Sequence, residues 1–152
     1  MFDDQQVLER LAVYMQADTP MGREAKFEKR MEELRETAAV SSEDVQELIG
    51  LAQTIQQAEA VWNMTIDNST EEQMAWNRQV ELCATVEQAE GLFQNTDDGS
   101  ANEMSVRERW LELCATVEQT YELYDSLDES VSSELREQVL AKLAEQLTAA
   151  GF

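Results

Sequence analysis

Apolar residues recur at intervals of three and four along most of the chain. One stripe runs, at steps of 4, 3, 4, 4 and 3, through Val106, Trp110, Leu113, Val117, Tyr121 and Tyr124. A second, similar stripe runs from Trp76 to Phe93. This spacing places the apolar side chains on one face of an α-helix. The pattern predicts six helices, over residues 3–17, 20–38, 42–62, 70–93, 102–127 and 132–149.

Polar residues at the expected helix starts support these boundaries. Thr19 precedes Pro20, which suits an N-cap followed by proline at the first helical position. Capping boxes are readable at Ser69-x-x-Glu72 and Ser100-x-x-Glu103, and Ser41 stands in the same relation to Asp44. With one proline and five glycines the chain lacks the turn residues that antiparallel sheets need. The sequence therefore predicts an all-α protein.

An internal repeat is the strongest long-range signal. Residues 80–93 read VELCATVEQAEGLF and residues 111–124 read LELCATVEQTYELY, an offset of 31 residues. Residues 51–62, LAQTIQQAEAVW, align with the same motif one further step of 31 back. We expect an antiparallel helical bundle or small helical array with a 31-residue helix-plus-loop repeat. A solenoid of helix pairs with 31-residue units is the alternative.

Charge is unevenly distributed along the 152 residues, whose length favours a single domain, 1–152. Residues 1–40 carry nine acids and six bases, and we expect a nearly balanced helical hairpin there. Residues 41–152 carry 23 acids and five bases and form a strongly acidic repeat region. The formal net charge is −21, which would repel nucleic acid and anionic membranes and favour a basic protein partner.

The residues that usually carry catalysis are scarce. The sequence contains no histidine and no glycine-rich phosphate loop, so we expect neither an enzyme nor a cofactor. Two cysteines, Cys83 and Cys114, cannot alone build a zinc site, and we expect no metal. These thiols are expected to be buried and reduced. With no secretion signal and no apolar stretch long enough to span a membrane, the expected location is cytoplasmic.

A ladder of acids marks the candidate partner-binding surface. Glu118, Glu122, Asp125 and Glu129 step by 4, 3 and 4, which would place them on one helix face. Four helical residues rise by about 6 Å, of the same order as the separation of successive phosphates along a nucleic-acid strand. The predicted acidic face consists of Glu81, Glu87, Glu90, Asp97, Asp98, Glu112, Glu118, Glu122, Asp125, Asp128 and Glu129.

The function expected from these features is a non-catalytic protein-binding module. We favour a nucleic-acid mimic that inhibits a DNA- or RNA-binding protein, as anti-defence proteins of phages and mobile elements do. The alternatives are an acidic helical chaperone or adaptor for a basic or amphipathic client, and a structural component of an assembly. A chaperone should show an apolar groove with an acidic rim, whereas a mimic should show an acidic face with little apolar exposure.

Overall fold

Polar caps set the start of most helices in the computed structural model, which describes residues 3–36, 40–97, 100–129 and 131–152. The Thr19 hydroxyl accepts a hydrogen bond from the backbone N–H of Gly22 at 3.0 Å, and Pro20 follows at the first helical position. Ser41 and Asp44 form a reciprocal capping box at the start of α3. The predicted caps at Ser69 and Ser100 likewise accept the backbone N–H groups three residues further on, at 3.1 Å each.

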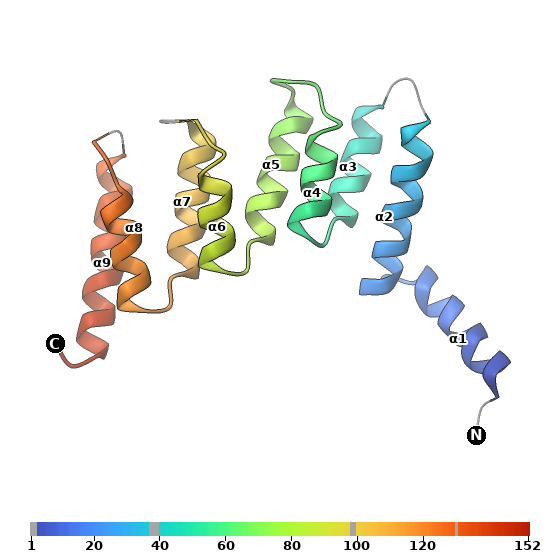
Figure 1. Ribbon diagram of the computed structural model, residues 1–152, viewed down its shortest axis with the longest axis horizontal. Coiled ribbons are helices and arrows are strands. Elements are labelled where there is room, and N and C mark those ends of the chain that lie inside the picture. Colours follow the sequence, from blue (N-terminus) through green and yellow to red (C-terminus); the bar gives the residue numbers. More distant parts are fainter. Residues whose placement is uncertain (1–2, 37–39, 98–99, 130) are drawn as a thin grey trace. The chain divides into compact units, whose positions relative to one another are not determined.

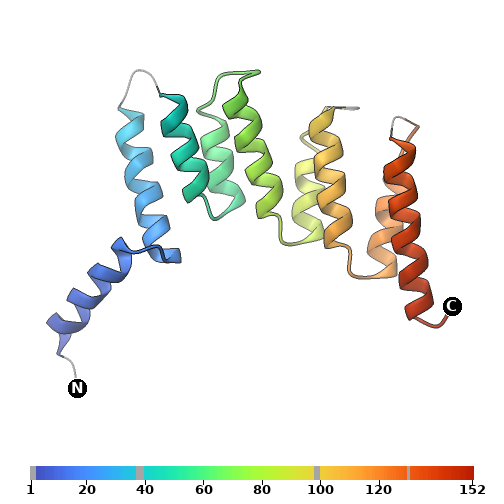
Figure 2. The ribbon, with the colours of Figure 1, turned by 180° about the vertical axis from the view of Figure 1, so that it is seen from behind.

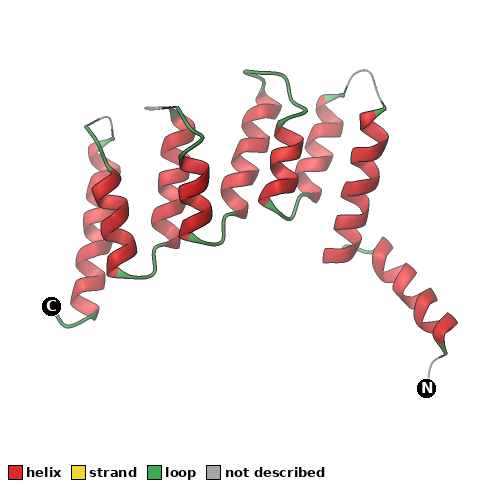
Figure 3. Ribbon diagram, viewed as in Figure 1, coloured by secondary structure: helices red, strands yellow, loops and turns green. Residues whose placement is uncertain are grey.

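Nine helices and no strand lie within the described residues, which confirms the all-α class (Figure 3). The chain divides into two compact units, Met1–Leu82 and Cys83–Phe152, here called unit 1 and unit 2. Unit 1 holds α1 (Asp4–Gln16), α2 (Pro20–Arg35), α3 (Ser42–Leu51), α4 (Ile55–Trp62) and α5 (Thr70–Leu82). Unit 2 holds α6 (Val86–Phe93), α7 (Ala101–Leu113), α8 (Val117–Ser126) and α9 (Ser133–Ala149). None of the described helices is both long and apolar enough to cross a lipid bilayer.

The prediction of six helices is wrong, because three of the predicted long helices are each broken in two. The breaks follow Leu51, Leu82 and Leu113, where the chain runs through three non-helical residues before the next helix begins. At each break a threonine hydroxyl (Thr54, Thr85 or Thr116) accepts the backbone N–H three residues on, at 3.1–3.2 Å.

A glutamine three residues after each threonine accepts a further backbone N–H group of the break. The side-chain oxygens of Gln57, Gln88 and Gln119 accept the backbone N–H of the residue before the threonine, at 2.7–2.8 Å. At Thr85 and Thr116 the glutamine also accepts the backbone N–H of the threonine itself, which completes a capping box inside an otherwise continuous apolar stripe. At Thr54 the glutamine is bonded to the N–H of Gln53. The stripe does not reveal this interruption because the apolar spacing continues across it.

Each unit is an array of packed helices (Figures 1 and 2). In unit 1, α2 packs on α3, α3 packs on α4 and α5, and α4 packs on α5. In unit 2, α6 packs on α7, α7 on α8, and α8 on α9. The buried core of unit 1 includes Phe27, Met31, Leu34, Val45, Leu48, Ala58 and Val61. In unit 2 the buried apolar residues include Cys83, Val86, Leu92, Val106, Trp110, Leu123 and Val139.

Candidate partner-binding surface

The predicted acids point to solvent wherever the structure describes them. Asp98 lies outside the described residues. The ten others are all exposed: Glu81, Glu87, Glu90, Asp97, Glu112, Glu118, Glu122, Asp125, Asp128 and Glu129. Glu81 is the second-last residue of unit 1, whereas the other nine belong to unit 2. The candidate surface is therefore described as a surface of unit 2.

Two of the predicted acids are partly neutralised by a base one helical turn earlier. Arg109 pairs with Glu112 at 2.8 Å, and Arg78 pairs with Glu81 at 3.2 Å. Both acids remain about two-thirds exposed, and exposed pairs of this kind contribute little to stability. They are the weaker members of the predicted set, because part of their charge is already compensated.

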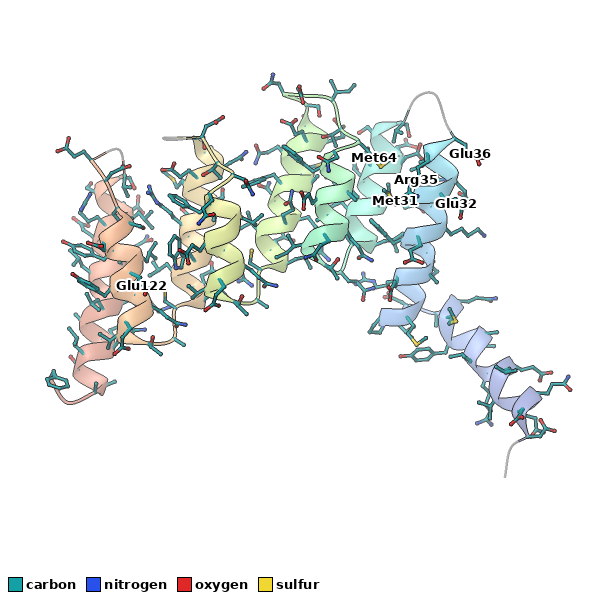
Figure 4. All side chains as sticks on the ribbon, in the orientation of Figure 1. Met31, Glu32, Arg35, Glu36, Met64 and Glu122 are labelled. Atoms are coloured by element: carbon teal, nitrogen blue, oxygen red, sulfur yellow. The ribbon has the colours of Figure 1, made fainter. Side chains whose placement is uncertain are left out.

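The acidic ladder is shorter than predicted. Helix α8 ends at Ser126, and Leu127 takes an extended conformation, so Glu129 lies beyond the helix. Glu118, Glu122 and Asp125 remain on α8 at steps of four and three, which places them on one face. Glu122 is labelled on α8 in Figure 4. Tyr121 lies on the same face and is 55% exposed. The ladder therefore consists of three carboxylates and one tyrosine ring.

Arg107 is the most deeply placed base of unit 2. It is 3% exposed, pairs with the equally buried Glu103 at 2.7 Å, and donates to the carbonyl of Ser126 at 3.2 Å. Its guanidinium also lies 4.8 Å from the centre of the Phe93 ring. This arginine holds the end of α8 against α7 and adds no positive charge to the surface.

The three remaining bases of unit 2 are also engaged with backbone carbonyls. Arg109 donates twice to the carbonyl of Cys83, at 2.7 and 3.2 Å. Arg136 donates to the carbonyl of Asp128 at 2.8 Å, and Lys142 donates to that of Leu111. All three are half-buried. Each base is thus held at the end of a helix or connector, where unpaired carbonyls carry partial negative charge.

The result is a unit whose acids face outward and whose bases face inward. Among its described acids Glu103 alone is buried, whereas its described bases are all buried or half-buried. Four exposed acids were missing from the predicted surface: Glu108, Glu134, Glu137 and Glu145. Three of them are on α9, where the sequence suggests compensation by Arg136 and Lys142. The carbonyl contacts of those two bases cannot be read from the sequence.

The two thiols are buried, as predicted. Cys83 and Cys114 are 1% and 3% exposed and are not joined in a disulfide. Burial raises the pKa of both thiols and outweighs the opposing effects of Arg109 on Cys83 and of Thr120 and Lys142 on Cys114. A raised pKa keeps the thiol protonated and weakly nucleophilic. In the described part of the chain, no group of three or more Cys, Asp or Glu side chains could hold a metal ion.

The chain matches no protein-family model, no curated protein and no solved structure.

Proposed function

We propose that the chain is a non-catalytic binding protein whose unit 2 presents an acidic surface to a basic protein. The observation that carries the proposal is the placement of charge: thirteen described acids of unit 2 are exposed, and its four bases are held at backbone carbonyls. Such a surface attracts a basic partner over long range and accelerates its association.

We further propose that the basic partner is a nucleic-acid-binding protein and that the surface takes the place of nucleic acid. The ladder Glu118, Glu122 and Asp125 supports this, because its carboxylates repeat along a rigid helix at intervals of about 4.5–6 Å. Nucleic-acid-binding sites are lined with Lys and Arg side chains. Counterions are released when these side chains neutralise regularly spaced negative charges. By occupying such a site, the protein would act as an inhibitor.

We also propose that 31-residue helix pairs are the structural unit that displays the acids. Three features support it at corresponding positions: the threonine caps at 54, 85 and 116, the arginines at 78 and 109, and the carbonyls of residues 52 and 83 that they bind. Arrays of helix pairs offer extended surfaces for binding other proteins. Substitutions on exposed faces would then change the partner without changing the fold.

The proposal is tested by affinity capture with matched variants. The α8 variant Glu118→Lys/Glu122→Lys/Asp125→Lys reverses the ladder, and Lys is as good a helix former as Glu. The control, Glu43→Lys/Glu59→Lys/Asp67→Lys, makes the same charge change at exposed positions of unit 1. We expect the wild type and the control to retain a basic nucleic-acid-binding protein that the α8 variant loses. Equal retention by all three would refute the proposal.

A second candidate, an adaptor or chaperone for an amphipathic client, is favoured by one observation. Unit 1 contains a groove with an apolar floor and acids on its rim, between α2 and α4.

A further inference from the structure

A hollow of unit 1 lies between α2 and α4 and has a volume of about 580 Å³. The apolar part of its lining, its floor, consists of Phe27 and Met31 from α2 and Ala60 from α4, and Gln56 and Gln57 of α4 also line it. Glu28, Glu32 and Arg35 line it from α2, and Figure 4 labels Met31, Glu32 and Arg35 along this helix. We call it the α2–α4 groove. Its volume lies within the range of about 300–1,000 Å³ that ligand pockets usually have.

The floor of the groove is held in place by the core beneath it. Phe27 and Met31 are 4% and 7% exposed and belong to the same buried cluster as Leu34 and Val61. Met64, which follows α4, packs against this cluster. A methionine thioether adapts its shape to different apolar partners, and Met31 gives the floor that property. An apolar side chain entering the groove therefore meets a preformed surface.

The polar residues that line the groove are Glu28, Glu32, Arg35, Gln56 and Gln57, which together carry a net negative charge. Glu28 and Glu32 lie one helical turn apart, both exposed, and neither forms an ion pair within the residues that the structure describes. The bases Lys26, Lys29 and Arg30 line a different hollow of α2, together with Glu33 and Glu47. Helix α2 thus turns carboxylates toward the groove and most of its positive charge elsewhere; Arg35 is the one base on the rim.

We propose that the α2–α4 groove binds an amphipathic basic helix of a partner protein. An apolar side chain of that helix lies on Phe27 and Met31, and two Lys or Arg residues spaced by four pair with Glu28 and Glu32. The spacing selects a helix, because residues i and i+4 of a second helix are separated by the same rise of about 6 Å. This site is separate from the α8 ladder, and the inference does not depend on nucleic-acid mimicry.

The test uses fluorescence anisotropy with a labelled synthetic peptide of about 18 residues, long enough to form a helix. It carries Leu along one face and Lys at i and i+4 beside that face. A second peptide has Glu in place of each Lys, and a third has the same composition in scrambled order. We expect the basic amphipathic peptide to bind at micromolar concentration, and each comparison peptide to bind at least about tenfold more weakly.

Two groove variants and one control locate the binding. Glu28→Lys/Glu32→Lys reverses the rim at exposed positions, so it should leave the fold intact, as circular dichroism will verify. Ala60→Trp fills the groove without changing charge. Each should weaken binding at least about tenfold, whereas Glu43→Lys/Glu59→Lys should change it less than about twofold.

Several results would overturn the inference. They are the absence of peptide binding, equal binding of the three peptides, and an equal loss in the Glu43→Lys/Glu59→Lys control. Dimerisation of the protein that Glu28→Lys/Glu32→Lys abolishes would identify a second copy as the occupant and would also overturn it.

Discussion

The guanidinium of Arg109 donates two hydrogen bonds to one carbonyl oxygen, that of Cys83, at 2.7 and 3.2 Å. Arg78 likewise donates two hydrogen bonds to the carbonyl of Ala52, at 2.8 and 3.3 Å. Both residues lie 31 positions before their counterparts, Arg109 and Cys83. Each arginine thereby satisfies a carbonyl at the break between two helices. Both guanidiniums are held partly buried by these bonds, and each also pairs with one exposed acid, Glu112 or Glu81.

Replacing Arg109 with methionine should destabilise the protein by about 1.5–3 kcal/mol, because a charged donor is removed from a half-buried carbonyl. Arg78→Met should cost a similar amount, since the geometry is the same. Urea denaturation followed by circular dichroism measures both. Lys26→Met, at an exposed position, is the control and should stay within about 0.5 kcal/mol of wild type. If the arginine variants were as stable as the control, the bonds to the carbonyls would not contribute to the free energy of unfolding.

The threonine caps at the helix breaks should be individually important. Thr116→Ala removes the hydroxyl that accepts the backbone N–H of Gln119 at 3.2 Å, and should cost about 1 kcal/mol. Ser133→Ala, at the exposed first residue of α9, is a matched control that removes a hydroxyl without removing a cap. A thermal melt that shifts equally for both variants would indicate that α7 and α8 are not separated by this cap.

These caps also show what the sequence could and could not reveal. The helical class, the starts at Thr19, Ser41 and Ser100, and the burial of both thiols follow from residue type and spacing. The prediction of six helices did not include the breaks before Thr54, Thr85 and Thr116, although Thr-x-x-Gln is a known capping-box sequence. The apolar spacing continues across each break and therefore favours one long helix. Within α8, however, the buried side chains are Thr120 and Leu123, and Tyr121, which belongs to the predicted stripe, is exposed.

The candidate surface was predictable in its acids but not in its extent. Exposure of Glu118 and Glu122 follows from their charge, whereas Tyr121, predicted to belong to the apolar stripe, lies beside them and is exposed. The end of α8 before Glu129 depends on the extended Leu127, and the inward placement of Arg136 and Lys142 depends on carbonyls distant in sequence. Tertiary contacts of this kind cannot be derived from charge counts along the chain.

The two thiols should react slowly and should link stability to pH. In the native protein, Cys83 and Cys114 should react with a thiol reagent more than about tenfold more slowly than in urea. Their pKa values are raised above the ordinary 9.0, so the folded state keeps protons that the unfolded state loses at high pH. The free energy of unfolding should therefore be preserved below pH 9.0 and should decline above it.

Cys83→Ala/Cys114→Ala is the matching variant, because alanine occupies the corresponding position 52. It should lose less stability than wild type between about pH 8.5 and 10.5, the range above the thiol's reference pKa. Titration of urea midpoints against pH measures this. Parallel slopes for the two proteins would show that the thiols do not contribute.

Salt should stabilise unit 2 in particular. Its exposed acids outnumber its bases by thirteen to four in the described residues. Raising salt from about 0.1 M to 1 M shortens the Debye length from about 10 Å to about 3 Å. In unit 1, Arg30 pairs with Asp44, Glu47 and Glu33, and the same screening weakens those attractions. Hydrogen exchange should show greater salt-induced protection in α6–α9 than in α2–α3. Greater protection in α2–α3 would contradict the proposed charge arrangement.

The most direct test of the central claim is competition with nucleic acid for the captured partner. A fluorescent oligonucleotide is bound to the partner, and increasing amounts of the protein are added at several salt concentrations. The account predicts complete displacement by the wild type, displacement that weakens steeply with salt, and at least about tenfold weaker displacement by Glu118→Lys/Glu122→Lys/Asp125→Lys. A stable ternary complex of partner, oligonucleotide and protein would contradict it.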